Sequence, residues 1–321
     1  MRYGRMTRAW MIAAIVALGV GALSLSLLAK DRYEEKFEKT EALAKDGKVF
    51  LGNVSGDVAV KTWDKAEVRI EALKMSEASS EAKAKENCAQ VTIEITREAG
   101  VLRIDTKYPH QKRFWGGDSL NVSVDYKLWI PSGASVEVKS VSGDVDLESL
   151  GGAVKARVVS GSVVLRKAAS GADLTTVSGE LTLEDVAGNV YLKTVSGDIG
   201  AVRVQGSIDA ESVSGGIEMR EVSGASGVNA KTLSGDVDYL GGLETKGRYS
   251  LKSHSGNVRM SLPADAAFSF DAETFSGDVD SDFKIEVSGK VSPREVHGTI
   301  NGGGAEVRLS TFSGSIDLKK S

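Results

Sequence analysis

The sequence predicts an all-β fold, a parallel β-solenoid of the β-helix or β-roll type. Three features of residues 141–230 lead to this prediction: a nine-residue repeat without gaps, glycine at the third position of nearly every unit, and apolar–polar alternation around positions five and seven. Positions one, five and seven are apolar at 29 of 30 places, far more often than a chain with 41% hydrophobic residues would give by chance. So strict a period indicates a repeat architecture.

Each nine-residue unit is expected to form one short strand and one corner. Apolar residues two positions apart, with polar residues on either side, are typical of a strand with one buried face. Glycine at the third position favours a tight turn, because it adopts backbone conformations that other residues resist. No single unit can bury its apolar face alone. We therefore expect successive units to stack, with positions one, five and seven facing the core.

A second period, of 18 residues, gives the size of one coil. The complete Val-Ser-Gly corner recurs at this spacing, at Gly143, Gly161, Gly179, Gly197 and Gly215. We expect an 18-residue coil with two flat faces. A three-sided coil with six-residue sides is the alternative, which the nine-residue columns disfavour. After residue 230 the corners at Gly235, Gly256 and Gly277 are 21 residues apart, so the coils should lengthen. The solenoid repeat region spans residues 136–321.

Residues 48–135 are expected to form a β-rich N-terminal part of the same domain. Residues 75–90 contain Ala, Glu and Lys but no β-branched residue, which predicts one short helix there. A Ser-Gly corner already occurs at Gly56, 87 residues ahead of the one at Gly143. Alternation predicts strands at residues 48–51, 58–62, 68–73, 91–96, 101–106 and 120–130.

Residues 1–30 are predicted to be a signal peptide or a signal anchor, followed by a charged linker with at most one strand at residues 31–47. Arg2, Arg5 and Arg8 precede an uncharged run at residues 9–29. A positive start followed by an apolar stretch is typical of exported proteins, and this run is long enough to span a bilayer. The sequence predicts export to the cell envelope, periplasmic or extracytoplasmic. If the leader is uncleaved, residues 9–29 anchor the chain in the inner membrane.

Composition argues against several classes of partner and chemistry. The net charge of −4 and the pI near 5.6 argue against nucleic acid, which usually needs a basic face. Cys88 is the only cysteine, so the chain has no internal disulfide. No nucleophile signature surrounds Cys88, and we expect it to have no catalytic role.

The repeat lacks the residue that calcium-binding nonapeptide solenoids use. Those repeats place an Asp two positions after their last glycine, and here that position is the apolar fifth column. The Asp residues that do occur follow the glycine directly, and we interpret them as turn residues that bond their own backbone: Asp144, Asp198, Asp236 and Asp278. We expect no metal and no cofactor.

Enzymatic activity is not expected either. Polysaccharide-cleaving solenoids need clustered carboxylates, usually on long inserted loops, and residues 141–230 contain no insertion. His110, His254 and His297 are isolated in the sequence. No Gly-x-Ser-x-Gly motif lies between a strand and a helix. We therefore assign no catalytic residue.

One loop, residues 107–117, departs from the pattern because it is basic and aromatic in an acidic protein. Its rings and cations could bind a sugar or an anionic polymer. The alternative is that the loop only caps the open end of the solenoid, with its rings over apolar residues. The candidate contact residues are Tyr108, Lys112, Arg113, Phe114 and Trp115.

Four segments together resemble a bacterial protein family: VSGDVAVKTWDKAEVRI, VDYKLWIPSGASVEVKSVSGDV, the repeated TVSGD corners, and GGGAEVRLSTFSGSIDL. The chain is similar over residues 48–318 to the DUF4097 "putative adhesin" family of exported β-strand-repeat proteins. The resemblance implies a β-solenoid in the cell envelope, with links in some members to envelope-stress regulation. It implies no catalytic residue.

Two non-enzymatic functions follow from these observations. The first is an adhesin-like envelope protein whose surface contacts a protein or an envelope polymer. The second is a membrane-anchored scaffold or a regulatory partner in the envelope-stress response. A released or surface-exposed chain favours the first function, and an uncleaved leader favours the second.

The column assignment predicts which substitutions destabilise the fold. Replacing the inward Leu183 by Ala should lower the free energy of unfolding by about 2–5 kcal/mol. Replacing its outward neighbour Thr182 by Ala should cost less than about 1 kcal/mol. Urea unfolding of the two variants measures the difference, and equal losses would show that the in–out register is wrong.

The loop assignment predicts a loss of binding to the envelope. Replacing Lys112, Arg113 and Trp115 together by Ala should weaken retention on isolated envelopes, because charge and stacking area are removed at once. Cooperative thermal unfolding of the triple variant serves as the control for folding. If this variant is retained as well as the parent, the loop is only a cap.

Overall fold

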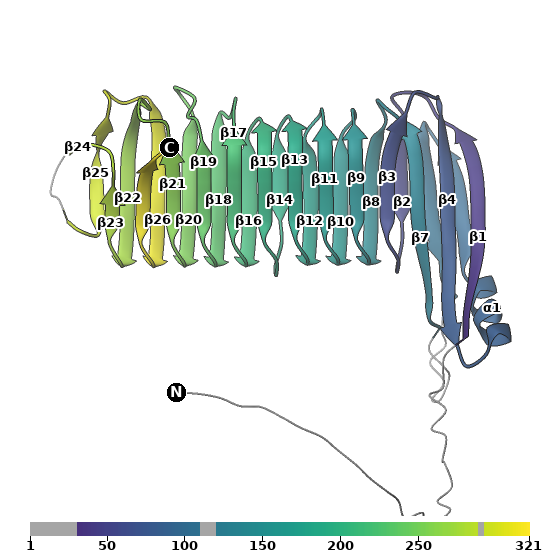
Figure 1. Ribbon diagram of the computed structural model, residues 1–321. Helices are drawn as coiled ribbons and strands as arrows, with labels where there is room; N and C mark the ends of the chain where they lie inside the picture. Colours follow the sequence, from purple (N-terminus) through teal and green to yellow (C-terminus); the bar gives the residue numbers. More distant parts are fainter. Residues whose placement is uncertain (1–30, 110–119, 288–291) are drawn as a thin grey trace, which may run out of the picture.

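The computed structural model describes residues 31–109, 120–287 and 292–321. These residues form two long β-sheets, sheet A with 13 strands and sheet B with 14, and one helix (Figure 1). The chain alternates between the two sheets and winds into a parallel β-solenoid, as the sequence predicts. The predicted leader, residues 1–30, lies outside the described residues.

The central coils repeat every 18 residues and have two flat faces. Val163 of one coil pairs with Leu181 of the next in sheet A, and Val154 pairs with Ala172 in sheet B. The strands of sheet A here are β9 (Val145–Leu150), β11 (Val163–Ala168), β13 (Leu181–Ala187), β15 (Ile199–Gln205) and β17 (Ile217–Val222). Those of sheet B are β8 (Ser135–Ser142), β10 (Val154–Ser160), β12 (Ala172–Ser178), β14 (Val190–Lys193), β16 (Ile208–Ser214) and β18 (Gly227–Ser234).

Positions five and seven face the core as predicted, and Leu183 is fully buried while Thr182 points outward. The expectation for position one is wrong in alternate units. Strands of sheet B alternate regularly through the corner, so the first-position valines there, such as Val177, stay on the outside at 43% exposure. In sheet A the residue before position one has a positive φ, for example Asp185 at 58°, and this turns Val186 into the core.

Glycine is required at the corners by the close approach of successive coils. Gly179 has φ 151°, and a Cβ atom on it would lie 2.1 Å from the carbonyl oxygen of Gly161 in the preceding coil. Its N–H donates to the carbonyl of Ser196 in the following coil at 3.0 Å. The same stacking repeats at each Ser-Gly corner, so the glycine column holds the coils in contact.

A buried column of Ser and Thr hydroxyls supports these corners from inside. Thr176 is 1% exposed, and its hydroxyl donates to the Gly161 carbonyl at 3.0 Å. Each such bond satisfies a corner carbonyl that would otherwise lack a partner in the core. The same contact to a corner glycine is made by Thr194, Ser212, Thr232, Ser253, Thr274 and Thr311.

Three of the four corner aspartates, Asp144, Asp198 and Asp236, bond the next coil rather than their own turn, contrary to the sequence interpretation. Asp144 Oδ1 accepts from the Ser162 N–H at 2.8 Å, and Asp198 Oδ1 accepts from the Gly216 N–H at 2.7 Å. Asn257 accepts from the Ser315 N–H at 2.9 Å in the same way. Parallel stacking brings the next backbone N–H within reach, so an acceptor side chain of either charge state serves here.

The coils lengthen after β18, but the last ones do not follow chain order. Val228 pairs with Tyr249, 21 residues later, which agrees with the predicted lengthening. The corner at Gly277, however, stacks on Gly314 rather than on Gly256, because β26 and β27 insert between the two preceding coils (Figure 1). The strands of this end are β19 (Val237–Gly241), β20 (Arg248–Ser255), β21 (Val258–Leu262), β22 (Phe268–Ser276), β23 (Val279–Ser281), β24 (Glu286–Val287), β25 (Glu295–Ile300), β26 (Ala305–Ser313) and β27 (Ile316–Lys320).

The N-terminal part extends both sheets and closes the other end. The early corner at Gly56 lies directly against Gly143, so two segments 87 residues apart form adjacent coils. Residues 31–47 are not a linker as predicted: β1 (Asp31–Ala42) pairs with β4 over its whole length. The other elements are β2 (Lys48–Gly52), β3 (Val58–Trp63), β4 (Glu67–Ala78), α1 (Glu81–Gln90), β5 (Thr92–Glu98), β6 (Val101–Lys107) and β7 (Val122–Pro131).

The single helix α1 is shorter than predicted. Ser80 caps its N-terminus by accepting from the Lys83 N–H, and residues 75–78 continue β4 instead. Met75 pairs with Glu34 of β1 and with Ser123 of β7, so sheet pairing on both sides overrides the helix propensity of this stretch. Figure 1 shows α1 beside the long ends of β1, β4 and β7, which extend beyond the solenoid body.

The glycine contact predicts a clear difference between two Gly→Ala variants. Gly179→Ala places a Cβ against the Gly161 carbonyl at positive φ, and should lower the free energy of unfolding by at least about 2 kcal/mol. Gly200 lies in β15, where an added Cβ meets no atom within 4 Å, so Gly200→Ala should change it by less than about 0.5 kcal/mol. Urea unfolding midpoints compare the two, and similar losses would refute the stacking constraint.

Candidate contact surfaces

The predicted loop is only partly within the described residues. Tyr108 is half-buried against the core, and its hydroxyl donates to the Val122 carbonyl at 3.0 Å. Burial raises the pKa of Tyr108 to about 12. This ring supports the sheet rather than offering a free face. Lys112, Arg113, Phe114 and Trp115 lie outside the described residues, so their contact role stays a prediction.

An exposed apolar column runs along one edge of the solenoid, where the strands of sheet B end. We call it the apolar ladder. Its members occupy the position before each Ser-Gly corner, and parallel pairing of the corner serines keeps them in register, as between Ser142 and Ser160. These ends lie along the lower edge of the body in Figure 1. The ladder consists of Val54, Val141, Val159, Val177, Val195, Val213, Leu233, His254, Phe312 and Phe275.

The ladder ends in a column of stacked rings. Phe275 and Phe312 stack with centroids 4.6 Å apart and planes 3° from parallel, and His254 stacks on Phe312 at 4.9 Å. Phe275 is 65% exposed and Phe312 48%. Because the rings face one another along the solenoid axis, their edges meet the solvent. The ladder is therefore a narrow apolar strip suited to contact with another apolar surface.

A groove crosses the outer face of sheet A near its N-terminal end, with a volume of about 690 Å³. We call it the sheet A groove. It crosses six neighbouring strands in the order β1, β4, β7, β3, β9 and β11. Alternation places two rows of side chains along it. The first row is Lys36, Leu73, Asp125, Asp57, Asp144 and Ser162, and the second is Glu38, Glu71, Lys127, Ala59, Asp146 and Val164.

Three aspartates of the first row are neighbours: Asp125 lies in β7, and Asp57 and Asp144 directly precede β3 and β9. Each has one carboxylate oxygen without a hydrogen-bond partner among the described residues. Asp125 Oδ1 accepts from the Asp57 N–H, and Asp57 Oδ1 accepts from the Asp144 N–H, both at 2.9 Å. Within the described part of the chain no Lys or Arg lies within 4 Å of these three carboxylates. The backbone bonds fix the row and leave its negative charge uncompensated.

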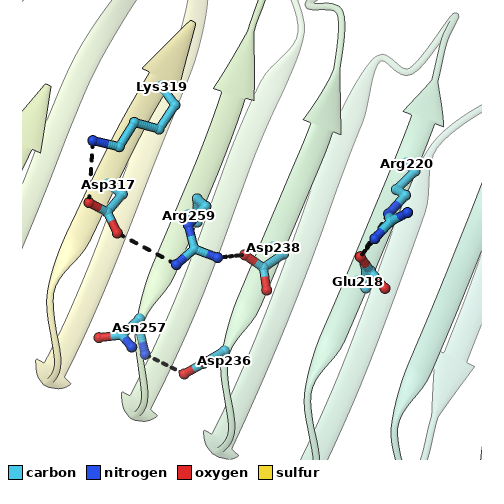
Figure 2. A network of polar contacts seen from close by, with 8 residues as sticks. All are labelled: Glu218, Arg220, Asp236, Asp238, Asn257, Arg259, Asp317 and Lys319. Atoms are coloured by element: carbon cyan, nitrogen blue, oxygen red, sulfur yellow. Dashed lines mark hydrogen bonds and ion pairs between the residues drawn. The ribbon is translucent and has the colours of Figure 1, made fainter. Parts of the chain in front are cut away.

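Farther along sheet A, Glu218 and Asp238 are paired with Arg220 and Arg259. Among the described residues the corner carboxylates Asp198 and Asp236 have only backbone N–H partners, but an uncharged residue, Gly216, separates them. Figure 2 shows Arg259 between Asp238 and Asp317, at 2.9 and 3.8 Å, and Lys319 reaching Asp317 at 3.8 Å. In the same view Asp236 accepts from the backbone N–H of Asn257. We call the row of residues that directly follow the Ser-Gly corners, such as Asp144, Asp236 and Asn257, the corner row. The sheet A groove thus differs from the part of this face shown in Figure 2, because in the groove three carboxylates follow one another with no uncharged residue between them.

The described residues include one cysteine and two histidines, His254 and His297, as potential metal ligands or reactive groups besides the carboxylates. No three His, Cys, Asp or Glu side chains there converge as metal ligands do. Cys88 is buried in the core, and burial raises the pKa of its thiol. His297 contacts Asp271 and Glu295, and the hydrogen bond to Glu295 raises its pKa. No helix in residues 31–109, 120–287 and 292–321 has the length and apolarity to cross a membrane.

Sequence reasoning missed both surfaces. The sequence predicts that the ladder valines face the core, because position one is apolar in every unit, buried or exposed. The hydroxyl residues at positions such as Thr176 held the signal, because they mark the inward position and therefore place Val177 outside. The groove could not be found, because its strands come from distant segments.

Comparison with known proteins gives a family and several solved structures. The family model described as "Toastrack DUF4097" matches residues 47–319. No curated protein matches.

The matching solved structures include three at low identity. A "putative cell adhesion protein" from Clostridium sporogenes is 12% identical, with 89% of this chain and 100% of that chain covered and a TM-score of 0.23. A "putative adhesin" from Bacteroides fragilis is 11% identical, with 88% and 97% covered and a TM-score of 0.39. One from Parabacteroides distasonis is 10% identical, with the same coverage and a TM-score of 0.35.

Proposed function

The chain belongs to the Toastrack DUF4097 family, and we propose that it is a non-enzymatic, adhesin-like protein of the cell envelope that acts by surface contact. Its partner is an envelope protein or polymer. The relatives described as adhesins and the export-type leader at residues 1–30 support this location. Such a protein needs an exposed surface that its partner can bind, and the repeat provides one in the apolar ladder.

The observation that carries the proposal is the apolar ladder. Nine of its ten stacked positions leave valine, leucine or phenylalanine side chains in water at exposures from 40 to 65%. Continuous exposed apolar surface is uncommon on a soluble protein and marks sites of contact. Val141 and its equivalents have no packing role that would require an apolar side chain, since polar residues fit outward strand positions equally well.

A membrane-anchored scaffold or an envelope-stress regulatory partner is the second candidate function. The uncharged run at residues 9–29 favours it, because this run is long enough to span a bilayer if it is not cleaved. In that case the ladder contacts another envelope protein rather than an external surface. Mass determination of the mature chain from envelopes distinguishes the two, since only a cleaved chain lacks the run.

Removing apolar surface from the ladder should reduce binding. A triple variant with Val159→Thr, Val177→Thr and Val195→Thr keeps β-branched side chains and should bind isolated envelopes about tenfold more weakly. The matched control replaces exposed apolar residues outside the ladder: Tyr191→Thr, Leu240→Thr and Val287→Thr. Equal retention of both variants and the parent would show that the ladder is not the contact surface.

A further inference from the structure

We propose that the sheet A groove binds an extended, cationic segment of another polypeptide, in which Arg or Lys alternates with apolar residues. This site lies on the outer face of sheet A, whereas the apolar ladder lies where the strands of sheet B end. The inference goes beyond the proposed function and does not rest on it. It is carried by the composition of the groove, by its charge and by its length.

The groove combines an apolar floor with an acidic side. Ala59, Leu73 and Val164 are outward residues that line it and remain half-buried. Asp125, Asp57 and Asp144 follow Leu73 in the first row, whereas Ala59 and Val164 belong to the second row. A ligand that fills the groove therefore meets three successive carboxylates and, beside them, aliphatic carbon from both rows.

The charge of the groove favours a cation over an anion or a neutral polymer. Six carboxylates line it against two ammonium groups, Lys36 and Lys127. Two of the carboxylates already have partners: Glu71 contacts Arg69, and Asp146 contacts Arg166 at 3.1 Å. Among the described residues the three row aspartates have none, although like charges on adjacent strands destabilise a sheet. A bound cation would relieve this repulsion.

The same row outside the groove shows that the charge is not needed for the fold. In the corner row Asn257 serves as the acceptor in place of Asp and bonds the N–H of Ser315 in the next coil, and Asn189 makes the equivalent bond at the opposite corner of the coil. A neutral side chain therefore satisfies the backbone as well as a carboxylate does. In the groove, each of the three successive aspartates uses Oδ1 for a backbone N–H, which leaves Oδ2 able to accept from Arg or Lys.

The length of the groove favours an extended chain over a small amine. Six strands at ~4.8 Å spacing give a groove about 24 Å long, which is the reach of about seven extended residues. Residues two apart in an extended chain are ~6.7 Å apart and point to the same side. Two cationic side chains at this spacing fit over the three carboxylates, while the residues between them turn toward the second row, at Ala59 and Val164.

Fluorescence anisotropy with the full-length chain in an uncharged detergent tests the proposal. The probe is a labelled nonapeptide of alternating Arg and Leu. Two further probes replace either every Arg by Glu or every Leu by Gly. We expect the Arg–Leu peptide to bind most tightly, the Gly version more weakly and the Glu version not at all. Equal affinity for the Leu and Gly versions would overturn the role of the apolar floor.

A charge-matched pair of variants locates the site. Asp57→Asn, Asp125→Asn and Asp144→Asn together keep the Oδ1 acceptors and should weaken binding of the Arg–Leu peptide about tenfold. The control removes the same number of charges from residues that follow Ser-Gly corners outside the groove: Asp198→Asn, Asp236→Asn and Asp278→Asn. This triple variant should change the affinity for the peptide less than about twofold. Equal effects of the two triples, or no binding by the parent, would overturn the proposal. Neither result would test the proposed function of the apolar ladder, because that function is tested by binding to isolated envelopes.

Discussion

The structure depends on the direct contact of glycine corners in successive coils. Each corner N–H donates to a serine carbonyl of the following coil, as Gly161 does to Ser178 at 2.9 Å, and no Cβ atom fits between the two backbones. This contact fixes both the spacing and the register of the strands. Because register is fixed, every side chain lies on its equivalent in the next coil, and each column has to tolerate contact with itself.

The columns meet this requirement in different ways. Aliphatic columns pack into the core, and the buried hydroxyl column is satisfied by donating to corner carbonyls, as Thr194 does to Gly179 at 3.3 Å. Outward charges alternate in sign or find a partner in an adjacent coil, as Lys193 and Glu211 do at 2.9 Å. In two columns of the described residues, the repeated side chains are neither buried nor paired with opposite charges. The apolar ladder stays in water, and the aspartate row of the sheet A groove repeats a negative charge.

The sequence was sufficient where the structure is local and periodic. The 18-residue coil, its two faces and the burial of Leu183 follow from the repeat alone. It was insufficient where segments distant in the chain meet. Nothing in residues 230–321 indicates that β26 inserts between β20 and β22, since the corner motif is the same at Gly256, Gly277 and Gly314. The groove shares this origin, because its row joins Asp125, Asp57 and Asp144 from three separate segments.

The closing of the two ends also explains why the contact surfaces differ. A strictly repeated ladder offers the same valine at each step, so a partner can bind it in several registers and gains area more than specificity. The N-terminal end breaks the repeat: β1, β4 and β7 pair antiparallel and place Leu73 and Asp125 beside the coil residues Ala59 and Asp57. In the part of the chain that the structure describes, only this place on the outer face combines a hollow, apolar residues and three successive carboxylates without a basic partner. We therefore expect specific recognition at the sheet A groove, where the repeat is interrupted. We expect extended contact along the apolar ladder, where the repeat is regular.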